Sequence, residues 1–258
     1  MTPLFEQLTA MTGLGEDWFR TVALVFLRVG AVLSVMPAFG EQTVPQRVRL
    51  ILALAFTAIV GPAVFASVAQ TKGYIQPAAV EVLVGLAIGI GLRLFIIALQ
   101  LAAAIIAQVT SLSQLFGGAT PEPQPAIGNL LTMAGLALAV LSGLHVKAAS
   151  LFILSYQILP AGQLPSAADM ADWGLLQIAN SLVLAFSLAA PFVIGSVIYN
   201  VALGIINRAM PQLAVSLVGA PVLTFAALLL MAVVVPLGLS VWLGSFDAFL
   251  AAPFKAGP

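Results

Sequence analysis

The stretch Tyr199–Pro221, which reads YNVALGIINRAMPQLAVSLVGAP, decides the fold of this chain. It is a short polar interruption between two long apolar runs. No charged residue occurs between Asp172 and Arg208, or between Arg208 and Asp247. Each run is longer than the roughly 20 apolar residues that cross the hydrocarbon core of a bilayer. Because Pro211 cannot continue a helix, the pattern predicts a helical hairpin whose tip lies near residues 207–212.

The tip of this hairpin contains Asn207, Arg208, Pro211 and Gln212, and it has two interpretations. In the first, it is an ordinary cytoplasmic turn in which Arg208 anchors the positive-inside end of the helix. In the second, it is a contact loop that a partner recognises. The pattern by itself leaves both open.

The composition indicates an integral membrane protein, or one whose apolar surface is covered by partner subunits. Of the 258 residues, 62% are hydrophobic and 7% are charged, and the mean hydropathy is +1.14. Ordinary soluble domains contain about 25% charged residues. Nine basic and nine acidic residues cancel, so nothing points to nucleic acid. With no cysteine and a single histidine, His145, the chain offers no catalytic, cofactor or metal-binding set, and we expect none.

The N-terminal region predicts an outside N-terminus followed by a first apolar segment at Trp18–Ala38. Residues 1–17 contain three acidic residues and no lysine or arginine, the opposite of a signal peptide. Arg28 lies deep in the segment, where a lone cation in lipid costs at least ~3 kcal/mol. Either the segment is shifted and leaves Arg28 at an interface, or Arg28 faces protein and pairs with a carboxylate or backbone carbonyls. We favour the pairing.

The turn Phe39–Arg49 is rich in glycine, proline and charge, and it holds the densest basic pair of the chain, Arg47 and Arg49. By the positive-inside rule, we expect this turn to be cytoplasmic. The second apolar segment, Leu50–Val68, contains Gly61-Pro62, which is predicted to kink the helix or to end it early.

The third apolar run, from Ala78 to about Gln114, is far longer than a single crossing needs. It contains Glu81 and Arg93, which lie too far apart to pair along one helix, so we expect each to have a partner elsewhere. A structural or inter-subunit role is favoured over a proton relay. Between them, Gly85-x-x-x-Gly89 permits another helix to approach closely.

A proline-rich segment follows and reads Leu115-Phe116-Gly117-Gly118-Ala119-Thr120-Pro121-Glu122-Pro123-Gln124-Pro125. Its alternating prolines remove backbone donors and favour an extended path, and its Gly-Gly pair permits a sharp reversal. The segment is either an ordinary loop between helices or non-helical backbone that is buried in protein or lines a water-filled space. The composition fits both.

The fourth apolar segment, Ile127–Leu159, is expected to break at Gly143 and to end at Leu159-Pro160-Ala161-Gly162. The polar connector Leu164–Trp173 follows. It is the best candidate boundary between two halves of the chain.

The hairpin then occupies Gly174–Trp242. Pro191 and Pro236 fall inside its two helices, so both helices are expected to be bent. The predicted fold class is therefore an all-α, polytopic membrane-type protein built from long, kinked helices in helical hairpins.

Three groups of motifs lie in the order and spacing of one known family. The first is Leu27-Arg28-Val29 followed by Val44-Pro45-Gln46-Arg47-Val48-Arg49. The second is Gly143-Leu144-His145, with Ser155-Tyr156 and Leu159-Pro160-Ala161-Gly162 after it. The third is the hairpin motif ALGxxNRxxPQ, followed by Val218-Gly219 and Pro221. From about Trp18 to Trp242, the chain resembles the FliR family of type III export gate subunits, which includes the equivalent subunit of virulence injectisomes.

The resemblance implies a core subunit of the flagellar type III protein export gate, in the bacterial inner membrane at the flagellar basal body. Family members assemble with FliP-like and FliQ-like subunits into a closed conduit for unfolded protein substrates, with FlhB-like and FlhA-like export components as further partners. Residues 1–170 would then correspond to a FliP-like half, and residues 171–258 to a FliQ-like hairpin. Neither a cofactor nor nucleic acid is implied.

Three groups of residues are the candidate functional sites. The resemblance places a pore plug at Leu115, Phe116, Gly117, Gly118, Thr120, Pro121, Glu122, Pro123 and Pro125. It also favours the contact-loop interpretation of Asn207, Arg208, Pro211 and Gln212. The candidate buried charges that support assembly are Arg28, Glu81 and Arg93.

Two other protein classes compete with this interpretation. A secondary transporter would also have broken helices and midplane charges, but it should contain two related halves, and the sequence has no visible internal repeat. A membrane enzyme needs a nucleophile, a metal set or a carboxylate pair, none of which the sequence offers. Within the family, the hairpin motif favours the flagellar branch over virulence injectisomes.

Overall fold

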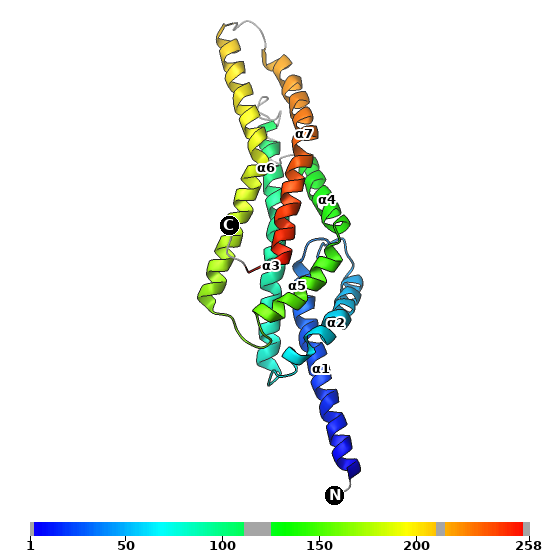
Figure 1. Cartoon of the computed structure of the whole chain (residues 1–258). Helices are drawn as coiled ribbons and strands as arrows, with labels where there is room; N and C mark the ends of the chain where they lie inside the picture. Colours follow the sequence, from blue (N-terminus) through cyan, green and yellow to red (C-terminus); the bar gives the residue numbers. More distant parts are fainter. Residues whose placement is uncertain (1–2, 111–124, 210–214, 255–258) are drawn as a thin grey trace. The chain divides into compact units, whose positions relative to one another are not determined.

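The structure, a computed structural model, describes residues 3–110, 125–209 and 215–254, and these regions contain helices but no strand. The helices described are α1 (Pro3–Val35), α2 (Gln46–Val68), α3 (Ile75–Thr110), α4 (Pro125–Leu141), α5 (Leu144–Ile158), α6 (Ala167–Ala209) and α7 (Val215–Ala251) (Figure 1). Five stretches in them are long and apolar enough to cross a membrane, or six if α4 and α5 form one bent span. The predicted all-α, polytopic membrane fold is confirmed.

The chain divides into two compact units. The first comprises residues 1–93, 140–177 and 247–258, and the second comprises residues 94–139 and 178–246. Each unit therefore combines segments from before and after the predicted boundary at residue 170. Since that boundary concerns likeness to partner subunits rather than compactness, it stays a prediction.

Helix α1 is longer than the apolar segment predicted from the sequence. It begins at Pro3, a residue that fits the first turn of a helix, and it ends at Val35. In the turn that follows, the Gly40 N–H donates a hydrogen bond to the Met36 carbonyl oxygen at 2.7 Å. A Cβ atom at Gly40 would lie only 2.7 Å from the same oxygen, so a larger residue would displace the backbone.

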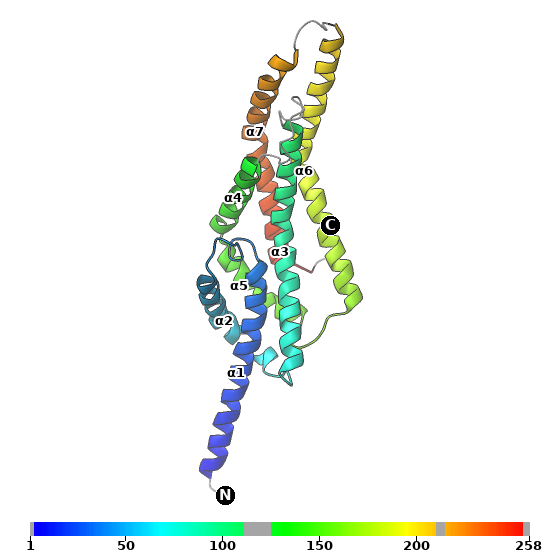
Figure 2. The same cartoon turned by 180° about the vertical axis from the view of Figure 1, so that it is seen from behind.

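Helix α1 packs closely against the first part of α3, and the two lie side by side in both views (Figures 1 and 2). A Cβ atom at Gly85 would lie 2.5 Å from the Arg28 carbonyl oxygen, and one at Gly89 would lie 3.0 Å from the Val32 carbonyl oxygen. The two glycines therefore allow the helix backbones to approach each other, and the close approach predicted from Gly85-x-x-x-Gly89 is confirmed.

Helix α2 lies beside α1 and also contacts α5. It continues to Val68 with Pro62 inside it, so of the two outcomes predicted for Gly61-Pro62 the early end is excluded, and the kink stays a prediction. A proline removes one backbone hydrogen bond, and in a membrane-type protein neighbouring helices can satisfy the backbone group that it leaves without a partner. Here Phe56 packs against the rings of Phe39 and Phe152, with centroid separations of 6.0 and 5.4 Å.

The predicted break and end of the fourth apolar segment are both confirmed. Gly143 separates α4 from α5 and has a φ of 83°, a conformation that favours glycine. After α5, the chain turns at Gly162, which has a φ of 70°. A Cβ atom there would lie 2.6 Å from the Thr71 Cγ2 methyl, so the turn packs tightly against the segment that leads into α3.

Helices α6 and α7 run antiparallel in the second unit, as the hairpin predicts, because Gly238 lies against Leu188 and Gly195 against Leu230. Both helices continue through their prolines, Pro191 and Pro236. The connector before the hairpin is shorter than predicted, since α6 already begins at Ala167. Asp169 lies in the first turn of α6, where the helix dipole favours a carboxylate.

The core of the second unit is organised around Trp242, which is fully buried. Its indole Nε1 donates a hydrogen bond to the Phe95 carbonyl oxygen at 2.8 Å, and its ring stacks on Phe246 with a centroid separation of 5.2 Å. Gly135 on α4 leaves room for the same ring. A buried tryptophan with a satisfied N–H fixes the packing of α3, α4 and α7 in this unit.

Candidate functional site

A buried ion pair joins α1 to α3 in the first unit. The side chain of Arg28 is 1% exposed and that of Glu81 is completely buried. Arg28 Nε donates to Glu81 Oε2 at 2.7 Å, and Arg28 Nη2 donates to Glu81 Oε1 at 3.0 Å. Two parallel hydrogen bonds of this kind make a strong, directional contact between a guanidinium and a carboxylate.

The other polar atoms of the pair have partners in α5 and in the turn after it. Arg28 Nη1 donates to Ser155 Oγ at 3.2 Å and to the Leu159 carbonyl oxygen at 3.0 Å. Glu81 accepts hydrogen bonds from the Tyr156 hydroxyl at 3.0 Å and from the Gly162 N–H at 3.1 Å. The Arg28 guanidinium carbon also lies 3.8 Å from the centroid of the Tyr156 ring, which is a cation–π contact. We call these residues the charge network: Arg28, Glu81, Ser155, Tyr156, Leu159 and Gly162.

The charge network specifies how α1, α3 and α5 pack, rather than adding a large net stabilisation. Burial of two ions costs several kcal/mol per ion, and their mutual attraction and hydrogen bonds offset that cost. Loss of one partner leaves the other charge uncompensated and typically costs ~3–5 kcal/mol. A packing that separated Arg28 from Glu81 would carry this cost, so the network favours one arrangement of the three helices.

The local sequence explains why these groups meet. Gly85 lies one helical turn after Glu81, and its missing side chain lets α3 approach the backbone of Arg28. On α5, Ser155 and Tyr156 are both buried. Gly162, in its left-handed conformation, then turns the chain so that its N–H points at the Glu81 carboxylate.

Three other ion pairs in the described part of the chain are partly exposed. They are Arg93–Glu41 at 2.5 Å, Lys147–Asp247 at 2.7 Å and Arg20–Asp17 at 2.5 Å. Partly exposed pairs contribute only ~0–1 kcal/mol each. The first ties the turn before α2 to α3, and the second ties α5 to the end of α7. The charge network differs from them because both of its charges are buried.

Of the residues singled out from the sequence, the structure brings together Arg28 and Glu81. Arg93 lies elsewhere on α3 and contacts Glu41, so Glu81 and Arg93 each have a partner on another segment, as their spacing predicts. Arg208 is exposed near the end of α6. Whether these charges support assembly with other subunits stays a prediction.

Several predicted site residues lie outside the described residues. They are Pro211 and Gln212 at the hairpin tip and, in the plug loop, Leu115, Phe116, Gly117, Gly118, Thr120, Pro121, Glu122 and Pro123. Pro125 is the first residue of α4, and Asn207 lies in the last turns of α6, although its side chain is also outside the description.

Sequence reasoning missed the part of the charge network contributed by α5 and its following turn. The sequence marks Ser155-Tyr156 only as part of a family motif and Leu159–Gly162 as the end of an apolar segment, and it assigns neither a role in the site. The structure gives these segments a role, because they supply the donors and acceptors around Arg28 and Glu81. The sequence contains one signal for this contribution: two opposite charges lie in apolar runs, and a polar Ser-Tyr pair lies in another apolar run.

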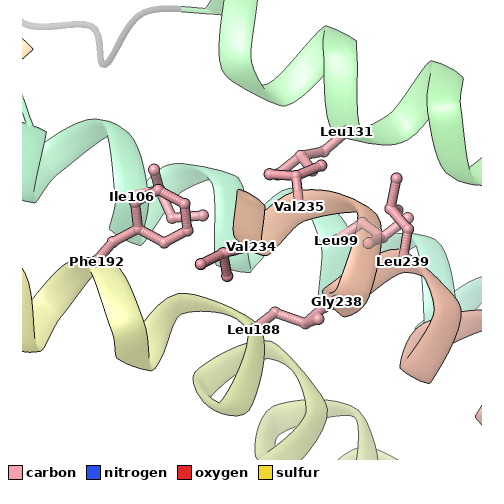
Figure 3. Close-up of a pocket in the computed structure, with 9 residues that line it drawn as sticks. All are labelled: Leu99, Ile106, Leu131, Leu188, Phe192, Val234, Val235, Gly238 and Leu239. Carbon is pink, nitrogen blue, oxygen red and sulfur yellow. The ribbon is translucent and has the colours of Figure 1, made fainter. Parts of the chain in front are cut away.

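The described residues do not form a metal site. They contain no cluster of three or more His, Asp or Glu that could hold a metal ion, and His145 is exposed on α5. The second unit has a cavity of about 20 Å³, far below the ~300–1,000 Å³ of typical ligand pockets (Figure 3). Its lining is entirely apolar: Leu99, Ile106, Leu131, Leu188, Phe192, Val234, Val235, Gly238 and Leu239. It is a packing defect between helices and offers no polar group to a substrate.

Comparison with known proteins identifies the family. The profile of bacterial export proteins, family 1, matches residues 19–249. The chain is also 36% identical over 216 residues to flagellar biosynthetic protein FliR of Caulobacter vibrioides. This alignment covers 81% of this chain and 86% of the relative. The chain belongs to the FliR family of bacterial export proteins. Two further FliR proteins are each 29% identical to this chain. For the FliR protein of Escherichia coli, the alignment covers 86% of this chain and 88% of the relative. For that of Bacillus subtilis, it covers 80% of this chain and 82% of the relative.

The FliR-family match includes every residue of the charge network, all of α6 and all but the last two residues of α7. The network is therefore part of the family region rather than of an extension specific to this chain. Together with the apolar helices, membership in the FliR family identifies a membrane protein of a bacterial export system.

Proposed function

We propose that this chain is a core subunit of the flagellar type III protein export gate. In this role it forms, with FliP-like and FliQ-like subunits, the inner-membrane conduit for unfolded export substrates. The observation that carries the proposal is the extent of the family match, residues 19–249, with a FliR protein at 36% identity over 81% of the chain. The relatives described above are flagellar proteins, which favours a flagellar gate over a virulence-type injectisome.

The dimensions of α6 support a place inside a larger assembly. Its apolar stretch Ala167–Ile206 has 40 residues, which at ~1.5 Å per residue extend over about 60 Å, twice the ~30 Å thickness of a bilayer core. A helix of this length cannot be covered by hydrocarbon alone. Partner subunits would cover the rest.

The exposed surface of the hairpin supports the same conclusion. Only 28% of the most apolar part of α6 and 11% of that of α7 are buried within the chain. Large apolar side chains, such as Phe225 and Val233, are about two-thirds exposed. Contiguous apolar surface of this extent belongs to a lipid or protein interface. In the proposed gate, residues 171–258 act as a FliQ-like hairpin against FliQ-like neighbours, and residues 1–170 act as a FliP-like half.

The charge network would serve the assembly by giving the FliP-like half one defined surface. Because it fixes α1, α3 and α5 against one another, it keeps the faces that meet partner subunits in register. The ion pair of Arg93 with Glu41 would hold the turn before α2 against α3 in the same way, but with a smaller contribution. The role is structural, with no catalytic step.

The segment Leu115–Pro125 is proposed as a plug that helps to seal the closed conduit. Its composition supports this role, because Leu115 and Phe116 are apolar contacts, Gly117-Gly118 allows movement, and the alternating prolines prevent a helix. An ordinary turn does not need eleven residues of this composition. The hairpin tip, residues 207–212, is proposed as a contact with a partner component such as an FlhB-like or FlhA-like protein.

A genetic complementation experiment tests the proposed function. Deletion of the gene should abolish swimming and the secretion of hook and filament proteins, and a plasmid copy should restore both. The same cells should retain secretion through other export systems. If filament proteins were still secreted normally without this chain, it would not be a core subunit of the flagellar gate.

A further inference from the structure

An open groove of about 400 Å³ lies on the first unit between α1, α2 and α3. Its walls are mostly apolar and include Phe26, Leu27, Leu50, Val82 and Leu86. The volume falls within the ~300–1,000 Å³ of typical ligand sites. Unlike the small cavity of the second unit, this groove is large enough for part of a hydrocarbon chain and is open to the surroundings.

One end of the groove is polar. Ser34 lies near the end of α1, and Gln46 and Arg49 lie in the first turn of α2. All three are therefore next to the turn at residues 36–45 that joins the two helices. The groove thus has an apolar body and a polar mouth, the same division as in a phospholipid.

The mouth of the groove is also positively charged. Arg49 Nη2 donates to the carbonyl oxygens of Glu41 and Val44 at 3.0 and 3.2 Å, and its Nε has no acceptor in the described part of the chain. None of the ion pairs found among the described residues uses Arg49. The one acidic residue of the turn, Glu41, is held by Arg93. Within residues 3–110, 125–209 and 215–254, no carboxylate therefore neutralises the Arg49 guanidinium.

We infer that this groove binds an anionic phospholipid, with an acyl chain along Phe26, Leu27 and Leu86 and the phosphate at Arg49. Basic pockets between membrane helices on the positive-inside face are suited to anionic headgroups. The basic turn is expected on that face. A helix from a partner protein would also cover the apolar walls, but it would pair with Arg49 only if it carried an acidic side chain at that place, whereas an anionic phospholipid always brings its phosphate. The charge at the mouth therefore selects a lipid, and a partner helix becomes an outcome of the test.

Gly30 provides a way to close the groove without straining the fold. It lines the groove on α1, and a Cβ atom there would meet no atom within 4 Å. Gly30→Leu therefore fills the groove with its own side chain. Gly15→Leu is the matched control, because Gly15 is on the same helix, has equally free space around it and lies outside the groove.

The experiment uses membranes from cells that make the full chain together with its native partners. Two probes are added in parallel: phosphatidylglycerol and phosphatidylcholine that carry the same photoactivatable diazirine acyl chain. After irradiation, the tagged chain is isolated and the labelled residues are mapped by mass spectrometry. We expect phosphatidylglycerol to label the groove about fivefold more than phosphatidylcholine, which corresponds to the ~1 kcal/mol that one basic residue contributes near an anionic surface.

The variants separate the two parts of the site. Gly30→Leu should abolish groove labelling by both probes, whereas Gly15→Leu should leave it unchanged. Arg49→Gln should reduce phosphatidylglycerol labelling to the phosphatidylcholine level, whereas Arg47→Gln, which removes an exposed charge outside the groove, should keep the preference. If Gly30→Leu lowers the amount of folded chain, the comparison of Arg49→Gln with Arg47→Gln decides whether the groove recognises an anionic headgroup.

Three results would overturn the inference. Equal labelling by the two probes in the wild type would mean that no anion is recognised. Labelling that persists unchanged in Gly30→Leu would place the lipid elsewhere. Absence of groove labelling while partners are present would mean that a protein segment occupies the groove. The experiment does not depend on the export role, because the labelling is read independently of secretion.

Discussion

Neutralisation of Glu81 tests the charge network most sharply. Glu81→Gln keeps the size of the side chain and removes its charge. Arg28 keeps its own charge, since a guanidinium is not deprotonated in proteins. An amide can offer only one acceptor oxygen in place of the carboxylate that now receives four hydrogen bonds, from Arg28 at 2.7 and 3.0 Å, Tyr156 at 3.0 Å and Gly162 at 3.1 Å. Buried donors are left unsatisfied beside an uncompensated cation.

The expected loss follows from the burial of the pair. Removal of one partner of a buried ion pair typically costs ~3–5 kcal/mol, a large share of the ~5–15 kcal/mol that holds an ordinary domain folded. Asp247→Asn is the matched control, because it breaks an ion pair of the same 2.7 Å length whose side chains are about one-third exposed. A pair of that kind contributes only ~0–1 kcal/mol.

The assay is the thermal midpoint of the detergent-extracted complex, followed by size-exclusion chromatography of heated samples, together with the amount of assembled chain. Glu81→Gln should lower the thermal midpoint and the amount of assembled chain strongly, and Asp247→Asn should lower them little.

Arg28→Leu should also impair the complex, but it should leave membrane insertion intact or improve it, because it removes a cation from an apolar segment. Combining Arg28→Met with Glu81→Leu should cost less than the sum of the two single changes. Equal midpoints for Glu81→Gln and Asp247→Asn would refute the reasoning, because burial would then not set the cost.

Three further predictions concern packing, sealing and partner dependence. Gly85→Ala should lower the same thermal midpoint, because its Cβ atom would lie 2.5 Å from the Arg28 carbonyl oxygen and overpacking costs ~1–3 kcal/mol. Gly61→Ala is the control and should leave the midpoint unchanged, because a Cβ atom there has free space around it. Equal effects of the two changes would contradict the close approach of α1 and α3. Replacement of residues 117–125 by a shorter flexible linker should preserve assembly and raise dye entry into cells that make the complete complex; dye entry at the wild-type level would make the segment a mere connector. The chain expressed alone should give a low, polydisperse detergent-extracted yield that FliP-like and FliQ-like partners restore, and a well-behaved monomer would argue against the assembly.

The sequence predicted the helices well where apolar runs end at glycine and proline. The break at Gly143, the end of α5 near Leu159 and the hairpin of α6 and α7 all follow from residues that cannot continue a helix, or from the absence of charge over a long run. At Gly61-Pro62 the sequence predicts either a kink or an early end, and the structure excludes the early end. A proline disfavours a helix by removing one hydrogen bond, but the packing of α2 against α1 and α5 outweighs that local cost.

The candidate site was predictable in part. A deep arginine in an apolar segment requires a partner, and the pairing of Arg28 with Glu81 meets that requirement. Which carboxylate would pair with it was not predictable, because the choice depends on how α1 packs on α3 around Gly85. The contributions of Tyr156 on α5 and of Gly162 in the turn after it depend on long-range contacts with Glu81 on α3, which neither periodicity nor spacing encodes.

The most direct test of the central claim is the composition of the complex that this chain forms in its own cells. The chain would be tagged at its chromosomal locus, extracted in mild detergent and isolated, and the mass of the intact complex and the identity of its subunits would be measured. We expect a complex that contains this chain together with several copies of FliP-like and FliQ-like subunits. Recovery of the chain alone, or only with copies of itself, would contradict the claim that it is a core subunit of the export gate.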